Sequence, residues 1–434
     1  MNKSNLIVLE LNEITFPWIK QYIKLGYLPE FARLIDNYGV CQTSSEDEYE
    51  NWEPWIQWVS MHTGKTFSQH GVFRLGDMKN SDIEQIWNLL ENKGVDVGAI
   101  CPMNAINNLK APKFFLPDPW TDTPTTGNYP SQLLSSAVKL LVNQNVSGNV
   151  NASTLISFGL AFLYFLKLKN IKTYFNYLLS SKKFTWRKAL FLDRILVDCF
   201  ISLQKKGNPQ FSTLFLNSGA HIQHHYLYNS ICYDGQQRNP SWYIEKSEDP
   251  VLEVYKLYDT IISDIRREFP DARLMIATGL SQDFYPYNTF YWRLIDHSGF
   301  MQKAKIENCR VEPRMSRDFA IFPKNIDDTN KIENVFSNCR ILGYPNKSVF
   351  TVDNRGDSLF VSLVWSDDIT EDTAISINGS LIADFRSCVG FVAVKNGHHN
   401  PIGYFLDTAE NKTEGNNKSI PITEIFNKIL NHFE

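Results

Sequence analysis

Short apolar runs alternate with amphipathic segments along much of this chain. Four of these runs, each six residues long, are 6–11, 95–100, 211–216 and 272–277. Runs of this length bounded by turn residues are typical of strands buried in a parallel sheet. Segments with helical spacing lie between them, for example at 29–38, 54–61 and 250–268. The pattern therefore predicts an α/β protein with a central, mostly parallel sheet flanked by helices.

Residues 119–210 break this alternation. Pro and Thr punctuate 117–130, and the segments with helical spacing that follow are 131–142, 153–168, 171–179 and 186–205. The sequence predicts a helical cap insertion over 119–210, within an α/β core made of 1–118 and 211–434. A further helix is predicted at 290–298, and residues 325–385 are predicted to form a small α+β appendage.

Twelve mostly apolar residues, 155–166, stand out within the predicted cap. The run is too short to span a bilayer. We predict a buried helix in a cap over the sheet. The alternative is a peripheral membrane contact through 151–187. The basic residues in favour of that alternative are Lys167, Lys169, Lys172, Lys182, Lys183 and Arg187.

Composition narrows the class of protein. The 434 residues are 43% apolar and 21% charged, which is ample for a large buried core. Because the formal net charge is -4 and no basic stripe is present, nucleic acid is not an expected partner. Seven scattered cysteines without a C-x-x-C pair indicate neither a disulfide framework nor a zinc knuckle. The first apolar run is short and interrupted by Glu10, so it has the pattern of a strand and not of a signal peptide, and we expect a cytoplasmic protein.

Three of the nine histidines fall within five residues, directly after an apolar run. If a helix begins near Ala220, then His221, His224 and His225 share one face of it. Imidazoles that converge in this way suit metal binding or proton transfer. The alternative is a surface loop that is rich in histidine.

Four segments, in order along the chain, resemble the motifs of one family. Residues 58–72 carry W-x-S-x-x-T-G followed by H-G-V, and 397–403 carry G-x-H-x-P-x-G. Residues 220–226 are similar to a D-x-x-Q-H-x-F/Y metal motif, and the opening strand, turn and helix lead to G-Y-L-P at 26–29. Together they resemble the type I phosphodiesterases and nucleotide pyrophosphatases of the alkaline phosphatase superfamily. The resemblance covers most of the chain except residues 119–210. The resemblance implies the fold of that superfamily.

In that family two divalent cations, usually zinc, are held by Asp and His at the strand ends, and a Thr or Ser attacks the phosphorus. This sequence departs from the pattern at most of those positions. Asn12 replaces the first Asp, with Glu13 where Gly is usual, Pro54 occupies the nucleophile position and Ala220 replaces the central Asp. Residues 278–281, T-G-L-S, replace S-D-H-G and supply neither ligand. His224 and His399 remain as metal ligands, so we expect one divalent metal, zinc or manganese, in place of two.

The other candidate residues follow from their places near strand ends. We predict catalytic roles for Glu13, Glu53 and His221, since paired carboxylates and imidazoles suit general acid–base chemistry. Glu53 has the alternative role of a helix-capping acid. Substrate binding is predicted for Asn12, Asn217, Arg314 and Arg317, because Arg forks suit phosphate; for each Arg the alternative is a structural pair with Asp. A structural role is predicted for His70, and for Glu10 either a ligand role or an ion pair with a core Arg.

These features, together with the resemblance, lead to two functional hypotheses. The first is a divergent hydrolase or transferase that acts on a phosphate-, sulfate- or nucleotide-bearing metabolite. The resemblance to divergent members of the family implies a sugar nucleotide or a lipid-linked sugar in surface-glycan assembly as the substrate. The second hypothesis is a non-catalytic relative that binds a ligand or partner, because the nucleophile and most of the metal ligands have been replaced.

Overall fold

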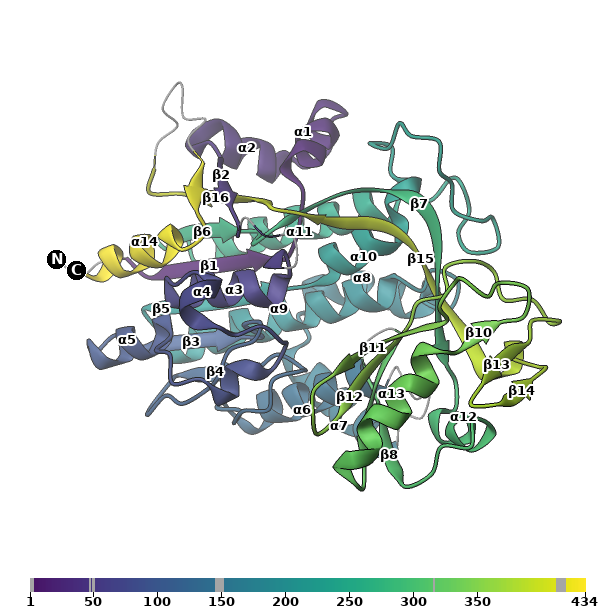
Figure 1. Cartoon of the computed structure of the whole chain (residues 1–434). Coiled ribbons are helices and arrows are strands. Elements are labelled where there is room, and N and C mark those ends of the chain that lie inside the picture. The colour runs from purple at the N-terminus through teal and green to yellow at the C-terminus, as the bar shows by residue number, and fades with distance from the viewer. Residues whose placement is uncertain (1–3, 47, 49–50, 145–151, 315–316, 411–418) are drawn as a thin grey trace. The chain divides into compact units, whose positions relative to one another are not determined.

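The computed structural model describes residues 4–46, 48, 51–144, 152–314, 317–410 and 419–434. Contacts divide the chain into two compact units. The first unit is built on a sheet with the strand order β17-β2-β16-β6-β1-β5-β3-β4 (Figure 1). Its strands are β1 (Leu6–Leu11), β2 (Cys41–Ser44), β3 (Val97–Ile100), β4 (Phe114–Leu116), β5 (Phe211–Leu216), β6 (Arg273–Ala277), β16 (Ile402–Asp407) and β17 (Ile420–Pro421).

Strand β1 lies near the centre of this sheet and is buried along its whole length. It pairs in parallel with both β5 and β6. The pairs of β3 with β4 and β5 are also parallel, whereas β16 runs antiparallel to β6 and β2. The predicted class, an α/β fold with a large, mostly parallel sheet, is therefore confirmed.

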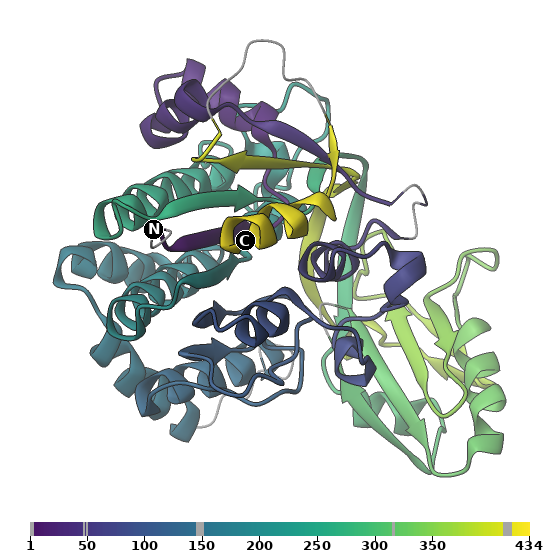
Figure 2. The same ribbon diagram turned by 90° about the vertical axis from the view of Figure 1, so that its left-hand side faces the viewer.

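Helices cover both faces of the sheet, as Figure 2 shows. One group consists of α3 (Pro54–Thr63), α5 (Ile86–Asn92) and α14 (Glu424–Phe433), in which α14 packs against the other two helices. The other group consists of α2 (Pro29–Tyr38), α9 (Arg187–Gly207), α10 (Ser218–Tyr226) and α11 (Pro250–Glu268). The shorter helices α1 (Phe16–Lys24) and α4 (Phe67–His70) pack beside α2 and α3. This double cover explains why the central strands are mostly apolar and show no regular alternation of apolar and polar residues.

The region 119–210 is helical, as its sequence indicates. It contains α6 (Tyr129–Gln144), α7 (Ala152–Phe165), η3 (Leu168–Asn170), α8 (Ile171–Ser180) and α9. Helix α9 packs directly against β3 and β5. The boundaries of the cap insertion stay a prediction. The expectation that 155–166 forms a buried helix is wrong for one face of α7, where Ile156 and Leu163 are 63% and 68% exposed. A uniformly apolar run has no polar side to tell which face meets solvent.

Among the described helices, none is long and apolar enough to cross a membrane by itself. Helix α7 and the segment from η3 through α8 reach that apolar length only as a pair, which is bent by 112°.

The second unit is Tyr285–Asn396 with a short piece that begins at Leu141. Its larger sheet has the antiparallel order β11-β12-β9-β8, from β8 (Cys309–Pro313), β9 (Asp318–Pro323), β11 (Phe350–Asn354) and β12 (Leu359–Leu363). A smaller sheet contains β10 (Arg340–Ile341), β13 (Ile375–Ile377) and β14 (Ser380–Ile382), and the helices are α12 (His297–Lys303) and α13 (Thr329–Ser337). The unit has its own apolar core, which includes Phe300, Phe319 and Phe350. The predicted appendage at 325–385 falls inside this unit, and its boundaries stay a prediction.

Two long strands, β7 (Ser281–Leu294) and β15 (Val389–Asn400), pair with each other and lead from the first unit into the second and back. The helix predicted at 290–298 is wrong, because β7 continues to Leu294 and α12 begins at His297. The sequence T-F-Y-W-R-L at 289–294 is rich in aromatic residues, which favour strands over helices.

A buried pair of ionisable residues links the centre of the sheet to α3. Glu10 is in β1 and His62 is in α3, with 0% and 2% of their side chains exposed, and Glu10 Oε1 lies 3.0 Å from His62 Nε2. Glu10 therefore has a buried partner, but this is a histidine and not the core arginine that we considered. Its Oε2 atom and His62 Nδ1 have no recorded hydrogen-bond partner among the described residues.

Candidate functional site

The candidate site lies where the central strands of the first unit end. The predicted site residues there are Asn12 and Glu13 after β1, Glu53 before α3, Asn217 before α10, His224 within α10 and His399 near the end of β15. In open α/β sheets, ligands bind at the carboxyl ends of the strands, where successive loops converge. The fold thus brings together residues that are almost 390 positions apart in sequence.

Glu13 has a backbone conformation that non-glycine residues rarely adopt. Its φ angle is 59°, in the left-handed region. Its amide donates to Thr278 O at 2.9 Å, and its carbonyl accepts from Gln223 Nε2 at 2.7 Å, so the turn is fixed on both sides. Such a conformation costs about 1–3 kcal/mol for a residue with a side chain and persists mainly at functional sites. The family motif has Gly at this position, where this chain keeps a carboxylate.

The Glu13 carboxylate is 2% exposed and is surrounded by polar groups. Its Oε2 atom lies 3.0 Å from His224 Nε2 and 3.4 Å from His399 Nε2. Gln282 Nε2 donates to the same oxygen at 2.5 Å, and Asn12 Nδ2 donates to Oε1 at 3.1 Å. Burial by itself would raise the pKa of Glu13, but the attraction and hydrogen bonds of His399 and His224 hold that pKa well below its usual range. The group is therefore a carboxylate at neutral pH.

The contacts of His224 indicate the tautomer of its ring, and therefore which nitrogen has a free lone pair. His224 Nδ1 lies 3.3 Å from the carbonyl oxygen of Gly397, which can only accept a hydrogen bond, so Nδ1 carries the proton. In the neutral imidazole Nε2 is then an acceptor, and it lies 3.0 Å from the acceptor Glu13 Oε2. Two acceptors at this distance require a cation or an added proton between them. Histidines that bind a metal through one ring nitrogen usually donate the other N–H to a carbonyl or carboxylate, which fixes the tautomer.

His399 is placed between two carboxylates. Its Nε2 faces Glu13, and its Nδ1 lies 3.5 Å from Glu53 Oε2. The side chain of Glu53 makes no capping hydrogen bond to α3, although Glu53 is the N-cap residue of that helix. The position of Glu53 beside His399 therefore favours a role in the site over the alternative role of capping acid.

Asn12 forms hydrogen bonds with three other residues beside the site. Its Oδ1 accepts from Trp58 Nε1 at 2.7 Å, while its Nδ2 donates to Asn217 Oδ1 at 2.8 Å and to Glu13. Both Asn12 and the Trp58 ring are fully or almost fully buried. Asn12 thus has its side-chain groups engaged by the protein and positions Glu13. Its predicted role in substrate binding, and that of Asn217, stays a prediction.

Other predicted residues lie outside the group around Glu13. His221 is exposed on α10, and its ring packs edge-on against His225 with centroids 5.0 Å apart. Arg314 and Arg317 belong to the second unit, where Arg314 pairs with Glu312 at 2.7 Å and Arg317 stacks on Tyr291 at 4.4 Å. Their catalytic and substrate-binding roles stay predictions.

His70 has contacts that fit the predicted structural role. Its Nδ1 accepts from the amide of Val72 at 3.0 Å, and its Nε2 is 3.1 Å from Ser60 Oγ. Burial lowers the pKa of His70 to about 4, so the ring is neutral and Nε2 donates to Ser60. The histidine therefore holds the turn after α4 against α3.

Three residues of the site were not identified from the sequence as functional. They are Gln282, which donates to Glu13 Oε2 and to Ala220 O; Gln223, which holds the Glu13 carbonyl; and Tyr255, which donates to Gln223 Oε1 at 2.6 Å. Gln223 is the Q of the 220–226 motif, which was the available signal. Gln282 follows directly after the degenerate T-G-L-S segment. No local pattern marks Tyr255, which lies inside a regular helix.

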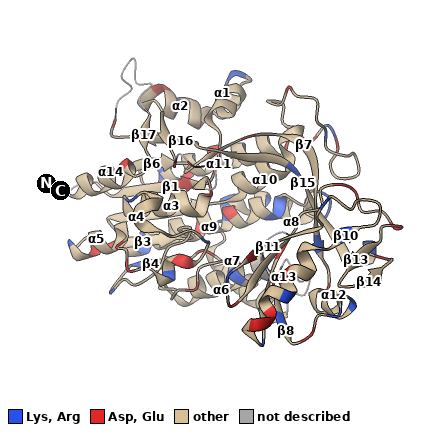
Figure 3. Cartoon of the chain, viewed as in Figure 1, with Lys and Arg blue, Asp and Glu red and all other residues tan. Residues whose placement is uncertain are grey.

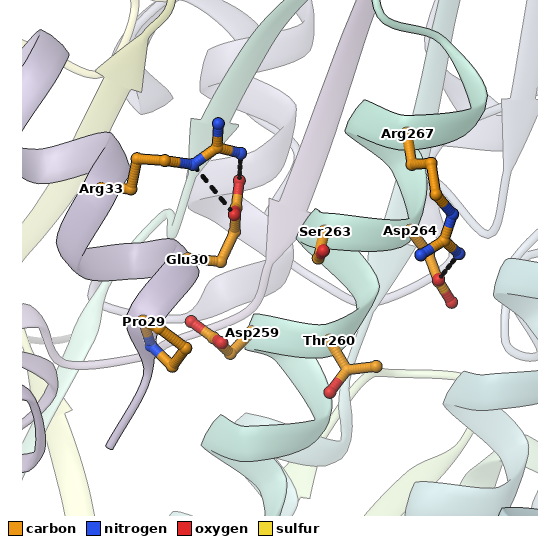
Figure 4. Close-up of a pocket in the computed structure, with 8 residues that line it drawn as sticks. All are labelled: Pro29, Glu30, Arg33, Asp259, Thr260, Ser263, Asp264 and Arg267. Carbon is orange, nitrogen blue, oxygen red and sulfur yellow. Dashed lines mark hydrogen bonds and ion pairs between the residues drawn. The ribbon is translucent and has the colours of Figure 1, made fainter. Parts of the chain in front are cut away.

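A pocket of about 370 Å³ lies elsewhere, between α2 and α11 (Figure 4). Its charged side chains pair with each other, Arg33 with Glu30 and Arg267 with Asp264. None of its lining residues belongs to the group around Glu13. The third carboxylate of the lining, Asp259, accepts from the amide of Phe31.

Comparison with known proteins gives a similarity of fold. No family model and no curated protein sequence matches the chain. Phosphonoacetate hydrolase from Sinorhizobium meliloti 1021, in complex with phosphonoformate, is similar with a TM-score of 0.47 and 11% identity, over 100% of this chain and 96% of that one. Murine ectonucleotide pyrophosphatase/phosphodiesterase 5 gives a TM-score of 0.46 and 11% identity over 99% and 94%, and the human protein gives 0.42 and 11% over the same shares.

All three TM-scores are below 0.5. At about one identical residue in ten, the chemistry has to be inferred from the residues of this chain.

Proposed function

We propose that the protein is a hydrolase or transferase with a single divalent metal, and that it acts on a phosphate-, sulfate- or nucleotide-bearing metabolite. One observation carries this proposal. Glu13, His224 and His399 each direct one ligand atom to a common point, and these atoms lie within 4.8 Å of one another. Two imidazoles and one carboxylate are the protein ligands of many catalytic zinc sites, in which a further position stays open.

The residues present fit one cation and do not fit two. A single carboxylate with two neutral imidazoles offsets half of one divalent charge, and an anionic substrate would offset the rest. The positions that would hold a second cation carry Asn12, whose amide is engaged by Trp58 and Asn217, and Ala220, which has no ligand atom. When bound, the cation would neutralise the oxygens of the transferred group. Zinc and manganese both suit such a donor set.

The side chains of this chain would supply binding and proton transfer. Asn12 and Gln282 donate hydrogen bonds to the Glu13 carboxylate and hold it in position. Pro54 has no hydroxyl, so the attacking oxygen would come from water or a second substrate and not from the start of α3. Glu53 lies at that helix start, 35% exposed, and is the base we propose for the incoming oxygen. Glu53 would keep that proton, and His399 Nδ1, which lies 3.5 Å from Glu53 Oε2, would position the carboxylate.

The substrate can be proposed more finely. The resemblance favours a sugar nucleotide or a lipid-linked sugar in surface-glycan assembly, and both carry a phosphate ester that a single cation could bind. The second candidate function is a non-catalytic relative that binds such an anion. The observation in its favour is that proline occupies the position of the nucleophile.

Replacing His224 by alanine tests the metal site. We expect the His224→Ala protein to remain folded, because the side chain is 28% exposed, and to lose bound metal and activity. Zinc and manganese affinities should be measured by calorimetry, and turnover with an activated phosphodiester such as bis-p-nitrophenyl phosphate. The matched control is His225→Ala, one residue further along α10 and outside the ligand set. Unchanged metal affinity in His224→Ala would refute the metal site, while metal binding without turnover of any phosphate or sulfate ester would favour the non-catalytic candidate.

A further inference from the structure

Helices α7 and α8 expose an unusual number of large apolar side chains. Of the 23 such side chains exposed among the described residues, nine lie between 155 and 179. The most exposed are Leu163, Leu168 and Leu179, at 68%, 80% and 78%. Scattered exposed apolar residues are ordinary, but a contiguous group marks a binding surface. We refer to the exposed apolar residues of 155–179 as the α7–α8 surface.

The opposite sides of the same helices are well packed. Phe158 and Phe162 of α7 contact the ring of Phe191 in α9, with centroids 6.0 and 5.4 Å apart. Tyr174 of α8 contacts the same ring at 5.2 Å, and its hydroxyl donates to the buried Asp198 at 2.8 Å. These contacts hold the two helices on α9. The α7–α8 surface is therefore a fixed face and can be altered without disturbing the core.

Basic residues dominate the sequence around this surface, and Lys169, Lys183 and Arg187 among them pair with acidic residues of other segments. Residues 123–192 contain seven Lys and one Arg and no acidic residue, although the whole chain has 47 Asp and Glu. Lys172, Lys182 and Lys188 are exposed, and no ion pair of theirs is recorded in the described part of the chain. Figure 3 colours Lys and Arg blue and Asp and Glu red along the ribbon. On α8 Lys172 shares a face with Phe175 and Leu179, and Lys182 follows just beyond the helix end at the same spacing.

We propose that the α7–α8 surface docks peripherally on a bilayer that contains anionic lipids. Aliphatic side chains flanked by unpaired lysines are the composition of interfacial helices, with the apolar residues in the acyl boundary and the lysines among the headgroups. The 112° bend between the two helices suits an arrangement that lies in the interface. A second copy of the chain is a poorer occupant, because Lys172, Lys182 and Lys188 of one copy would repel those of the other. This inference does not depend on the reaction at Glu13.

Co-sedimentation with vesicles tests the proposal. The full-length protein is expected to bind vesicles of phosphatidylcholine with about a third phosphatidylglycerol far more tightly than pure phosphatidylcholine, and to dissociate as salt is raised. Leu163→Gln combined with Leu179→Gln should weaken binding more than about tenfold. Lys172→Gln combined with Lys182→Gln should weaken it by about fivefold per lysine and only on the anionic vesicles. The matched control, Leu342→Gln with Leu381→Gln, changes two exposed leucines of the second unit and should bind like the unmodified protein.

Other results would overturn the membrane proposal. Absence of binding to both kinds of vesicle would do so, as would binding that survives the leucine and lysine substitutions alike. Light scattering distinguishes the other occupant: a dimer that becomes a monomer on Leu163→Gln with Leu179→Gln, without vesicle binding, would assign the surface to self-association. Hydrolysis of a soluble activated phosphodiester should be unchanged in all of these variants, because none of the altered residues belongs to the group around Glu13.

Discussion

Replacing Glu13 by glutamine is expected to weaken binding of Zn²⁺ or Mn²⁺ by more than about a hundredfold, since even outer-shell changes commonly cost 10–100-fold in metal affinity. Glutamine keeps the size of the side chain but removes the carboxylate that faces both His224 and His399. Turnover should fall at least in proportion. Metal affinity by calorimetry and metal content by mass spectrometry measure the effect. The matched control is Glu91→Gln, a half-buried carboxylate outside the ligand group that accepts from the amides of Lys110 and Ala111.

A glycine at the same position separates backbone strain from metal chemistry. Glu13→Gly should lose metal affinity as Glu13→Gln does, because both lack the carboxylate. The glycine variant should nevertheless unfold at a urea concentration no lower than that of the glutamine variant, because the φ angle of 59° costs glycine nothing. Retained metal affinity in either variant would show that Glu13 is not a ligand. A glycine variant clearly less stable than the glutamine variant would show that the side-chain hydrogen bonds of Glu13 outweigh the strain.

The second large effect is expected in the core. His62→Ala should lower the free energy of unfolding by about 3–5 kcal/mol, because it leaves the buried carboxylate of Glu10 without its partner. The substitution also removes an imidazole that contacts the rings of Trp58 and Trp87. Urea denaturation followed by tryptophan fluorescence measures the change. As a control, Lys93→Ala breaks the exposed pair with Glu434 and should change stability very little.

The double replacement Glu10→Leu with His62→Phe should recover most of the stability lost in His62→Ala. Apolar residues of similar volume remove the need to bury charge, and such replacements of a buried pair are often neutral. A double variant as unstable as the single one would mean that packing around His62, and not the unpaired carboxylate, determines the loss.

The fold could be predicted from the sequence largely because the central strands are buried on both faces. The mostly apolar runs of β1, β5 and β6, which are buried along nearly their whole length, leave few alternatives to a parallel sheet. The failures came where the apolar pattern has no distinct polar side. The aromatic segment of β7 was interpreted as helical, and α7 was interpreted as buried although one of its faces is exposed.

Some residues of the candidate site could be identified from the sequence, and others could not. Glu13, His224 and His399 were identified because they follow strands or stand in motifs, and the structure brings them together. Gln282 and Tyr255 were missed, because a hydrogen bond to a distant carboxylate or amide leaves no periodic signal in the sequence. Their positions depend on how β7 and α11 pack, which only the folded chain defines.

The paired strands β7 and β15 have a consequence for dissecting the protein. Asp283 and Asn400 lie where these strands leave and rejoin the first unit, and Asn400 Nδ2 donates to Asp283 Oδ2 at 2.5 Å. Residues 285–396 therefore form an inserted segment whose two ends lie close together. This is the usual geometry of a domain inserted into another domain. A short linker from Phe284 to Gly397 would excise it while leaving both Gln282 and His399 in the shortened chain. Such a minimal protein would be the direct means of separating what the metal-ligand group does alone from what the inserted unit adds.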